Sequence, residues 1–167
     1  SGDMLEAALT AGLCSMGAKV IPLGVVPTPA VAYLTRYYKA DAGVVISASH
    51  NPCEYNGIKF FNSDGYKLSD GIENEIESYI LGEKAIEELP THGKVGYVSA
   101  NHNAVEDYVA FAVSTIDCRL DGMKIAVDCA NGASYETAFK ALNKLGANVE
   151  AIHNLSLIHI SEPTRQA

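Results

Sequence analysis

The sequence predicts an α/β fold: a mixed, mainly parallel sheet with flanking helices, followed by the start of a second, similar α/β domain. Short apolar segments alternate along the chain with segments of helical periodicity. The apolar segment 42–48 is continuous rather than alternating, which is typical of a strand buried on both faces. The stretches SMGAKVIPLG and KLGANVEAIH share one order, a helix end, a glycine and a strand, which indicates a repeated unit.

Composition narrows the classes of function. The chain has 167 residues, 48% of them hydrophobic, so it can bury a core of one domain or slightly more. Its 20 acidic residues outnumber 12 basic ones, which disfavours a nucleic-acid partner. No apolar run is long enough to span a bilayer and no signal segment opens the chain, so we expect a cytoplasmic protein with no membrane partner. The sequence carries no signal for an oligomeric state.

The first elements follow from spacing and from proline. Residues 1–16 place apolar side chains at helical intervals, and Gly17 is suited to end that helix. A strand is expected at 18–24. Two prolines in VVPTP lack the N–H that a strand or helix needs, so this stretch separates the strand from a helix at 30–39.

The middle of the chain contains the longest predicted loop. The strand at 42–48 runs into SHNPCEYNG, residues 49–57, which is rich in Asn, Pro and Gly. A strand at 58–62 follows, and the turn Ser-Asp-Gly predicts a hairpin with the next segment, YKL. A helix is expected from Ser69 or Asp70 to about Leu81.

The last third repeats the strand and helix order. A strand is expected within KVGYV at 94–98 and a helix at 105–116. A β-α-β unit follows, with strands at 123–130 and 147–152 and a helix at 135–145 between them. Because ligands of parallel α/β sheets bind at the carboxyl ends of strands, the loop after residue 48 is the first candidate site.

The stretch ISASHNPCEYNGIKFFNSDGYKLSD, residues 46–70, carries the candidate chemistry. Ser47 and Ser49 end the buried strand, and Lys59 lies on the next strand. A rigid loop that presents a hydroxyl, backbone amides and one cation suits a phosphate. We expect Ser47 to bond the loop backbone. His50 is a poor general base for Ser49, because neighbouring residues on an extended segment point apart.

The word SASHNP resembles the active-site loop of the α-D-phosphohexomutases, whose common form is Thr or Ser, Ala, Ser, His, Asn, Pro. Four flanking segments are similar to the bacterial phosphoglucosamine mutase branch of that family: YNGIKFF, DGYKL, PLGVVPTPAVAYL and SGDMLEAALTAGL. The resemblance extends over roughly 1–154. It implies an isomerase that interconverts glucosamine 6-phosphate and glucosamine 1-phosphate through a phosphoserine and a bisphosphorylated sugar, feeding UDP-N-acetylglucosamine and cell-wall synthesis.

The resemblance also implies a role for each loop residue. Ser49 would be the phosphoserine and, through its phosphate, a ligand of the family's Mg²⁺ cofactor. Lys59, which matches the lysine of the family's NGIK word, would assist proton transfer or stabilise charge. His50 and Asn51 would orient the loop, with Asn51 also a candidate for binding the substrate. The expected partner is a small sugar phosphate.

The resemblance predicts a domain I at 1–117, without its usual amino-terminal segment, and a truncated domain II at 118–154. The last residues, 155–167 (LSLIHISEPTRQA), do not resemble the family. They are similar to a peptide that arises when sequencing-adapter DNA is translated, so we expect them to be non-native. The other Mg²⁺ ligands and the sugar-recognition loop of the family lie outside the chain, so we expect the isolated chain to be inactive.

Three alternatives remain open. A phosphomannomutase or phosphoglucomutase would share this loop, because the residues that select the sugar lie elsewhere in the family. A noncatalytic sugar-phosphate-binding module could keep the loop without the chemistry, although intact Ser49, His50 and Lys59 argue against it. A serine hydrolase is disfavoured, because the chain lacks the GxSxG word of the hydrolase nucleophile turn.

Overall fold

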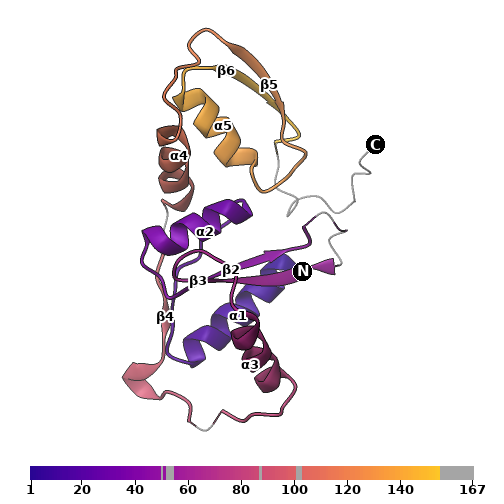
Figure 1. Ribbon diagram of the computed structural model, residues 1–167, viewed down its shortest axis with the longest axis vertical. Coiled ribbons are helices and arrows are strands. Elements are labelled where there is room, and N and C mark those ends of the chain that lie inside the picture. The colour runs from indigo at the N-terminus through magenta and orange to yellow at the C-terminus, as the bar shows by residue number, and fades with distance from the viewer. Residues whose placement is uncertain (50, 52–54, 87, 101–102, 155–167) are drawn as a thin grey trace. The chain divides into compact units, whose positions relative to one another are not determined.

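A computed structural model describes residues 1–49, 51, 55–86, 88–100 and 103–154 (Figure 1). The chain divides into two compact units. The first unit comprises Ser1–Pro22 and Thr35–Ala100, and the second comprises Leu23–Leu34 and the described residues from 103 onward. The predicted boundary near residue 117 stays a prediction, and the predicted non-native tail at 155–167 lies outside the described residues.

Helices and strands alternate as predicted. The helices are α1 Gly2–Ser15, α2 Thr28–Tyr37, α3 Asp70–Ile80, α4 Ala104–Ser114 and α5 Tyr135–Lys144, with a 3-10 turn at His92–Lys94. The strands are β1 Lys19–Val20, β2 Ala42–Ser47, β3 Gly57–Asn62, β4 Tyr97–Val98, β5 Lys124–Asp128 and β6 Asn148–Ile152. The predicted strands at 18–24 and 94–98 are only two residues long. Pro22, which has no N–H to donate, limits the first of them.

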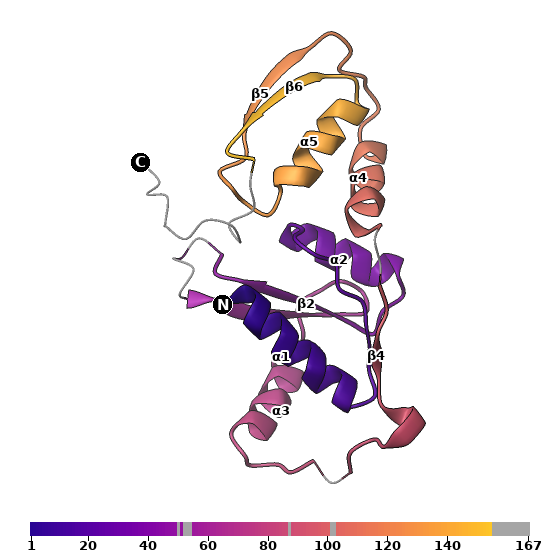
Figure 2. The same ribbon diagram turned by 180° about the vertical axis from the view of Figure 1, so that it is seen from behind.

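The strands of the first unit form two pairs. β1 pairs with β4 in parallel, and β2 pairs with β3 in antiparallel register from Ala42↔Asn62 to Ser47↔Gly57. Helix α1 packs against β1, β2 and β4 (Figure 2). The hairpin predicted between 58–62 and YKL forms over a short stretch, with one antiparallel bridge, Phe61↔Lys67, and a hydrogen bond of 2.8 Å from the N–H of Asn62 to the carbonyl of Tyr66. The first unit therefore contains one parallel and one antiparallel pair in separate two-stranded sheets, and the antiparallel pair precedes and follows the loop of interest.

The second unit contains the predicted β-α-β unit. β5 and β6 pair in parallel from Lys124↔Asn148 to Asp128↔Ile152, and α5 connects them. Helix α4 packs on α5. Within the same unit the rings of Tyr33 and Phe111 stack with centroids 3.9 Å apart. The parallel pairing confirms the sequence prediction for this stretch.

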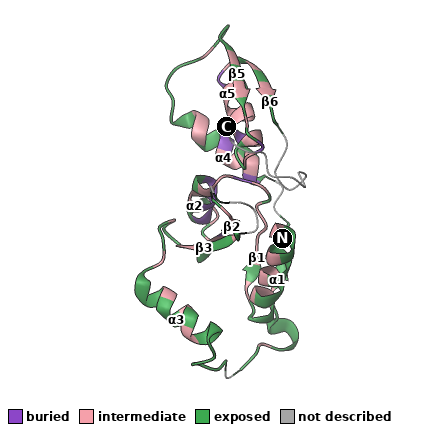
Figure 3. Cartoon of the chain, turned by 90° about the vertical axis from the view of Figure 1, so that its right-hand side faces the viewer, coloured by how far each residue is buried: buried purple, intermediate pink, exposed green. Residues whose placement is uncertain are grey.

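The buried residues concentrate on α2 and α4 and at the end of α5, as the purple segments of Figure 3 show. Leu34 and Val109 are the largest fully buried side chains, each with none of its surface exposed. By contrast, α1 and α3 contain no buried residue. Among the described residues, no helix is both long and apolar enough to cross a membrane.

Candidate active site

The candidate site begins where β2 ends. Gly43 and Val45 are buried on this strand, and Ser47 forms its last pair, with Gly57 of β3. Past that pair the two strands separate into the SHNPCEYNG loop. The loop predicted as the site therefore follows the carboxyl end of β2 directly, and its role in binding a ligand stays a prediction.

Ser49 is exposed and adopts the left-handed backbone conformation, with φ of 58°. Its N–H donates a hydrogen bond of 2.9 Å to Oγ of Ser47, which confirms that Ser47 bonds the loop backbone. The N–H of Asn51 donates to the carbonyl of Ala48 at 3.0 Å and closes the turn. A left-handed conformation costs a non-glycine residue roughly 1–2 kcal/mol, so the local hydrogen bonds must hold Ser49 there.

Lys59 is exposed on β3, directly opposite Val45. Cross-strand partners lie on the same face of a sheet and alternate residues along a strand share a face, so Lys59 lies on the face of Ser47. Within the part of the chain that the structure describes, no ion pair of Lys59 is found. The hairpin therefore presents an ammonium on the face where β2 ends, with no acidic partner among the residues that the structure describes.

The end of the loop nearest β3 is hydrogen-bonded to the residue before α1. Nδ2 of Asn56 donates a hydrogen bond of 2.7 Å to Oγ of Ser1, the residue that precedes α1. The sequence carries no signal for this hydrogen bond, because its two partners lie 55 residues apart. Sequence reasoning also missed the left-handed conformation of Ser49, for which a serine carries no sequence signal, since glycine and asparagine are the usual occupants.

The structure describes three of the four predicted site residues. Ser49 and Asn51 lie in one turn, both exposed, and Lys59 lies on the strand that leaves the loop. His50 lies outside the described residues, so its predicted role in orienting the loop stays a prediction.

The predicted Mg²⁺ has limited support from side chains. Among the described residues, no group of three or more His, Cys, Asp or Glu side chains could hold a metal ion. A phosphate on Ser49 would offer the hard oxygen ligand that Mg²⁺ prefers, which fits a site completed by ligands from outside these residues.

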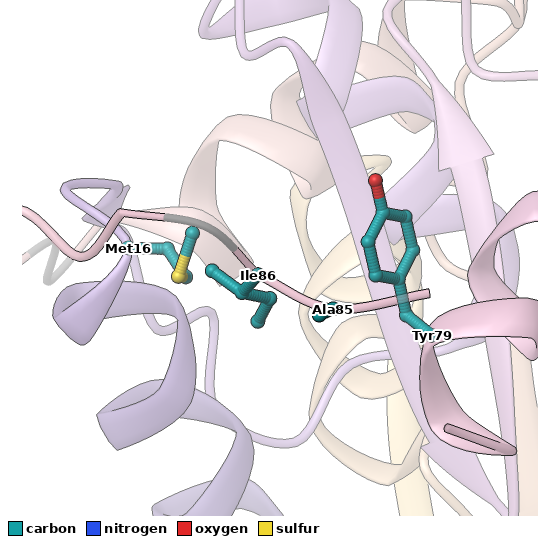
Figure 4. Close-up of a pocket in the computed structure, with 4 residues that line it drawn as sticks. All are labelled: Met16, Tyr79, Ala85 and Ile86. Carbon is teal, nitrogen blue, oxygen red and sulfur yellow. The ribbon is translucent and has the colours of Figure 1, made fainter. Parts of the chain in front are cut away.

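Two surface pockets of the first unit have a different chemistry. One, of about 480 Å³, is lined by Met16, Tyr79, Ala85 and Ile86 (Figure 4), none of which carries a charge. The other, of about 670 Å³, lies along α1 and includes the carboxylates of Asp3 and Glu6. Neither pocket has a described cation to bind a phosphate, so the loop remains the better candidate.

A related turn follows β5. Oδ1 of Asp128, the last residue of that strand, accepts the N–H of Ala130 at 2.9 Å and lies 2.9 Å from Nδ1 of His153. The Ala130 N–H, with a second contribution from His153, holds the pKa of Asp128 below its ordinary value. Because this carboxylate already occupies the turn, we interpret the turn as structural rather than as an anion site.

Known proteins resemble the chain throughout its described length. Curated proteins named phosphoglucosamine mutase from Clostridium acetobutylicum and Acetivibrio thermocellus are each 61% identical over 154 residues, which is 92% of this chain and 34% of theirs. The counterpart from Clostridium novyi is 60% identical over the same length. The chain thus spans about a third of the length of these relatives.

A solved structure and a family model also match the chain. A phosphoglucomutase/phosphomannomutase family protein from Burkholderia thailandensis superposes with a TM-score of 0.73 at 25% identity, over 93% of this chain and 34% of the other. The family model for phosphoglucomutase/phosphomannomutase, alpha/beta/alpha domain I, matches residues 1–87, which is more than half of the chain. With the serine loop at the end of β2 inside the matched range, the chain belongs to the phosphoglucomutase/phosphomannomutase family.

Proposed function

We propose that the chain is the domain I region of a phosphoglucosamine mutase, an isomerase that interconverts glucosamine 6-phosphate and glucosamine 1-phosphate. The observation that supports this most is an exposed, left-handed Ser49 at the end of β2, in a chain 61% identical over 154 residues to a protein of that name. The product would feed UDP-N-acetylglucosamine and peptidoglycan precursors. The rest of the active site would come from the other two thirds of the length of such proteins.

Ser49 carries the transferred phosphate in this proposal. In the first half-reaction the bond from phosphorus to Ser49 Oγ breaks, a bond to a sugar hydroxyl oxygen forms, and the hydroxyl proton ends on Ser49 Oγ. The bisphosphorylated sugar then returns the phosphate from its other position to Ser49, and the proton moves the opposite way. The two halves leave the enzyme unchanged and move the phosphate between two sugar positions.

The negative charge of the phosphoserine must be balanced by positive charge near the loop. A phosphoserine carries about −1.5 to −2 charges near neutral pH, so transfer between oxygens needs positive charge close by. Lys59 supplies one cation, either to stabilise the transferring oxygen or to pass the proton. When bound, Mg²⁺ would neutralise further charge, with the Ser49 phosphate as one ligand. Asn51 would contact the sugar phosphate, and His50 would orient the turn.

The cysteines are consistent with a cytoplasmic location, which is part of the proposal. Cys14, Cys118 and Cys129 are free thiols, as is usual in a reducing compartment.

The test exchanges the 154 matched residues of the Clostridium acetobutylicum enzyme for those of this chain, which yields a chimaeric mutase of full length. We expect the chimaera to turn over and to carry phosphate on Ser49, detected by peptide mass spectrometry. Ser49→Ala should abolish both, with a loss of at least about a thousandfold in kcat, because it removes the nucleophile. Lys59→Met should lower kcat about a hundredfold.

Lys19→Met is the matched control, because Lys19 is also an exposed lysine on a strand of the first unit. It should leave turnover unchanged. A chimaera that is inactive although correctly folded would contradict the proposal. Normal turnover by the Ser49→Ala chimaera would favour the noncatalytic binding module.

A second candidate is a phosphomannomutase or phosphoglucomutase, which the name of the Burkholderia thailandensis structure favours. The chimaera does not separate these sugars, because most of its length comes from the relative. Turnover of glucosamine, glucose and mannose 1-phosphates by the full-length gene product would distinguish them.

A further inference from the structure

We propose that Ser47 is a positioning residue for phosphoryl transfer, whose hydroxyl holds the backbone of Ser49 in the left-handed conformation. The inference rests on the proposed function of Ser49 as the phosphate carrier. It adds a residue that does not itself exchange phosphate but determines where the Ser49 hydroxyl points.

The local geometry supports this directly. Ser47 is the last residue of β2, and its position is fixed by pairing with Gly57. Its Oγ accepts the Ser49 N–H at 2.9 Å, a bond that spans two residues and leaves little freedom to the backbone between them. Ser49, with φ of 58°, is in a region that non-glycine residues avoid unless their surroundings hold them there. The hydrogen bond therefore connects an ordered strand to a strained, exposed nucleophile.

The turn after β5 contains the same arrangement. Asp128 ends its strand, accepts the N–H of Ala130 two residues later at 2.9 Å, and Ala130 has φ of 46°. Among the described residues, six non-glycine residues have positive φ, and Ser49 and Ala130 are two of them whose N–H donates to the side chain that ends the preceding strand. In both turns, a side-chain oxygen at the end of the strand accompanies a left-handed residue. The recurrence indicates that the oxygen is the local cause of the conformation.

The rate of phosphoryl transfer depends on the fraction of molecules in which Ser49 has the left-handed conformation. Without the Ser47 hydroxyl, part of the molecules would relax Ser49 to an ordinary backbone conformation and turn its Oγ away from the transfer geometry. The rate falls in proportion to the competent fraction, whereas the competent molecules bind sugar phosphate as before. Losing one such hydrogen bond corresponds to about a two- to twelvefold loss, which should appear in kcat and leave KM unchanged.

The test compares Ser47→Thr with Ser47→Val in the chimaeric mutase described above. Threonine and valine have nearly the same shape, but only threonine keeps a hydroxyl, so the pair isolates the hydrogen bond. We expect Ser47→Thr to stay within about twofold of the parent in kcat per phosphorylated molecule, and Ser47→Val to lose about two- to twelvefold. The ³¹P resonance of the phosphoserine should shift in the valine variant and stay close to that of the parent in the threonine variant.

Two further variants complete the test. Ser47→Ala removes the hydroxyl without adding methyl groups, so it replaces the valine variant if that one fails to fold. Ser78→Ala is the matched control, because Ser78 is a half-buried serine of the same unit whose Oγ donates to a backbone carbonyl, that of Glu75, at 2.7 Å. It should change neither kcat nor the ³¹P resonance.

The possible outcomes separate this inference from the proposed function. Equal kcat and equal ³¹P resonance in the threonine and valine variants, with Ser49 phosphorylated, would overturn the role of Ser47 alone. A lower melting temperature in the valine variant with unchanged kcat per phosphorylated molecule would also overturn it, because the hydroxyl would then serve only stability. An active parent with no phosphate on Ser49 would overturn both.

Discussion

Glu106 joins α4 to α5 through two ion pairs, and removing its charge should destabilise the second unit in a pH-dependent way. Oε1 lies 2.7 Å from Nζ of Lys140, and Oε2 lies 2.8 Å from Nζ of Lys144. The hydrogen bonds from these two lysines, Lys140 first, lower the pKa of Glu106 from 4.5 to about 2. Glu106→Gln keeps the shape of the side chain and removes the charge, so it isolates this contribution.

The expected magnitude is smaller than the pKa alone would indicate. A fall from 4.5 to about 2 corresponds to about 3 kcal/mol if it acts wholly on stability. The Glu106 side chain is 48% exposed, however, so water and salt screen both pairs. Exposed ion pairs contribute roughly 0.2–1 kcal/mol each, and we therefore expect Glu106→Gln to cost about 1 kcal/mol of unfolding free energy at pH 7.

The sign of the pH dependence follows from the direction of the pKa. Because the folded state has the lower pKa, the stabilisation is complete above the unfolded pKa near 4.5 and is lost as the pH falls towards 2. Urea unfolding followed by circular dichroism, at pH 7, 4.5 and 3, should show the two proteins converging as the pH falls. High salt should narrow the difference at pH 7.

Glu150→Gln is the control, because Glu150 is an exposed carboxylate on β6 of the same unit for which no ion pair is found among the described residues. It should change stability by less than about 0.5 kcal/mol at every pH. Equal stability of the parent and Glu106→Gln at pH 7 would refute the reasoning. A difference that stays constant from pH 7 to pH 3 would also refute it.

Three further predictions concern packing and turns. Leu34→Ala should lower the free energy of unfolding by about 2–5 kcal/mol in urea titrations, because Leu34 is fully buried; a loss below about 1 kcal/mol would contradict this. Gly146→Ala should lower the melting temperature of the chain, because Gly146 has φ of 98° and a Cβ there would collide with the side chains of Asp121 and Arg119; an unchanged melting temperature would argue against that collision. The Asp128 carboxyl should titrate below an ordinary aspartate in a carbon-detected NMR titration, because the N–H of Ala130 and the ring of His153 bond its charged form; a normal midpoint would show that these bonds are not formed.

Most helices could be predicted from the sequence because their signals are local. Apolar residues at helical intervals placed α1, α4 and α5 to within two residues, and glycines at 17 and 146 have the left-handed conformations that end α1 and α5. The strand 42–48 was equally clear, since its continuous apolar run has no helical period.

Strand lengths and partners were predicted less well. Apolar stretches at 18–24 and 94–98 indicated full strands, but each yields two paired residues. A strand exists only where a partner supplies hydrogen bonds, and partners lie far away in sequence. The hairpin predicted between β3 and YKL forms only one bridge, Phe61↔Lys67, whereas the pairing of β3 with β2 along its whole length was not predicted.

The sequence by itself predicted the order of elements, the β5-α5-β6 unit and the loop that bears Ser49, because composition and periodicity are local properties of the chain. Only the tertiary structure decided the left-handed backbone of Ser49, its hydrogen bond to Ser47 and the face that Lys59 occupies. The backbone conformation of a serine depends on what its neighbours bond, and the face of a lysine depends on strand register. Both are set by contacts between residues, which a linear pattern does not specify.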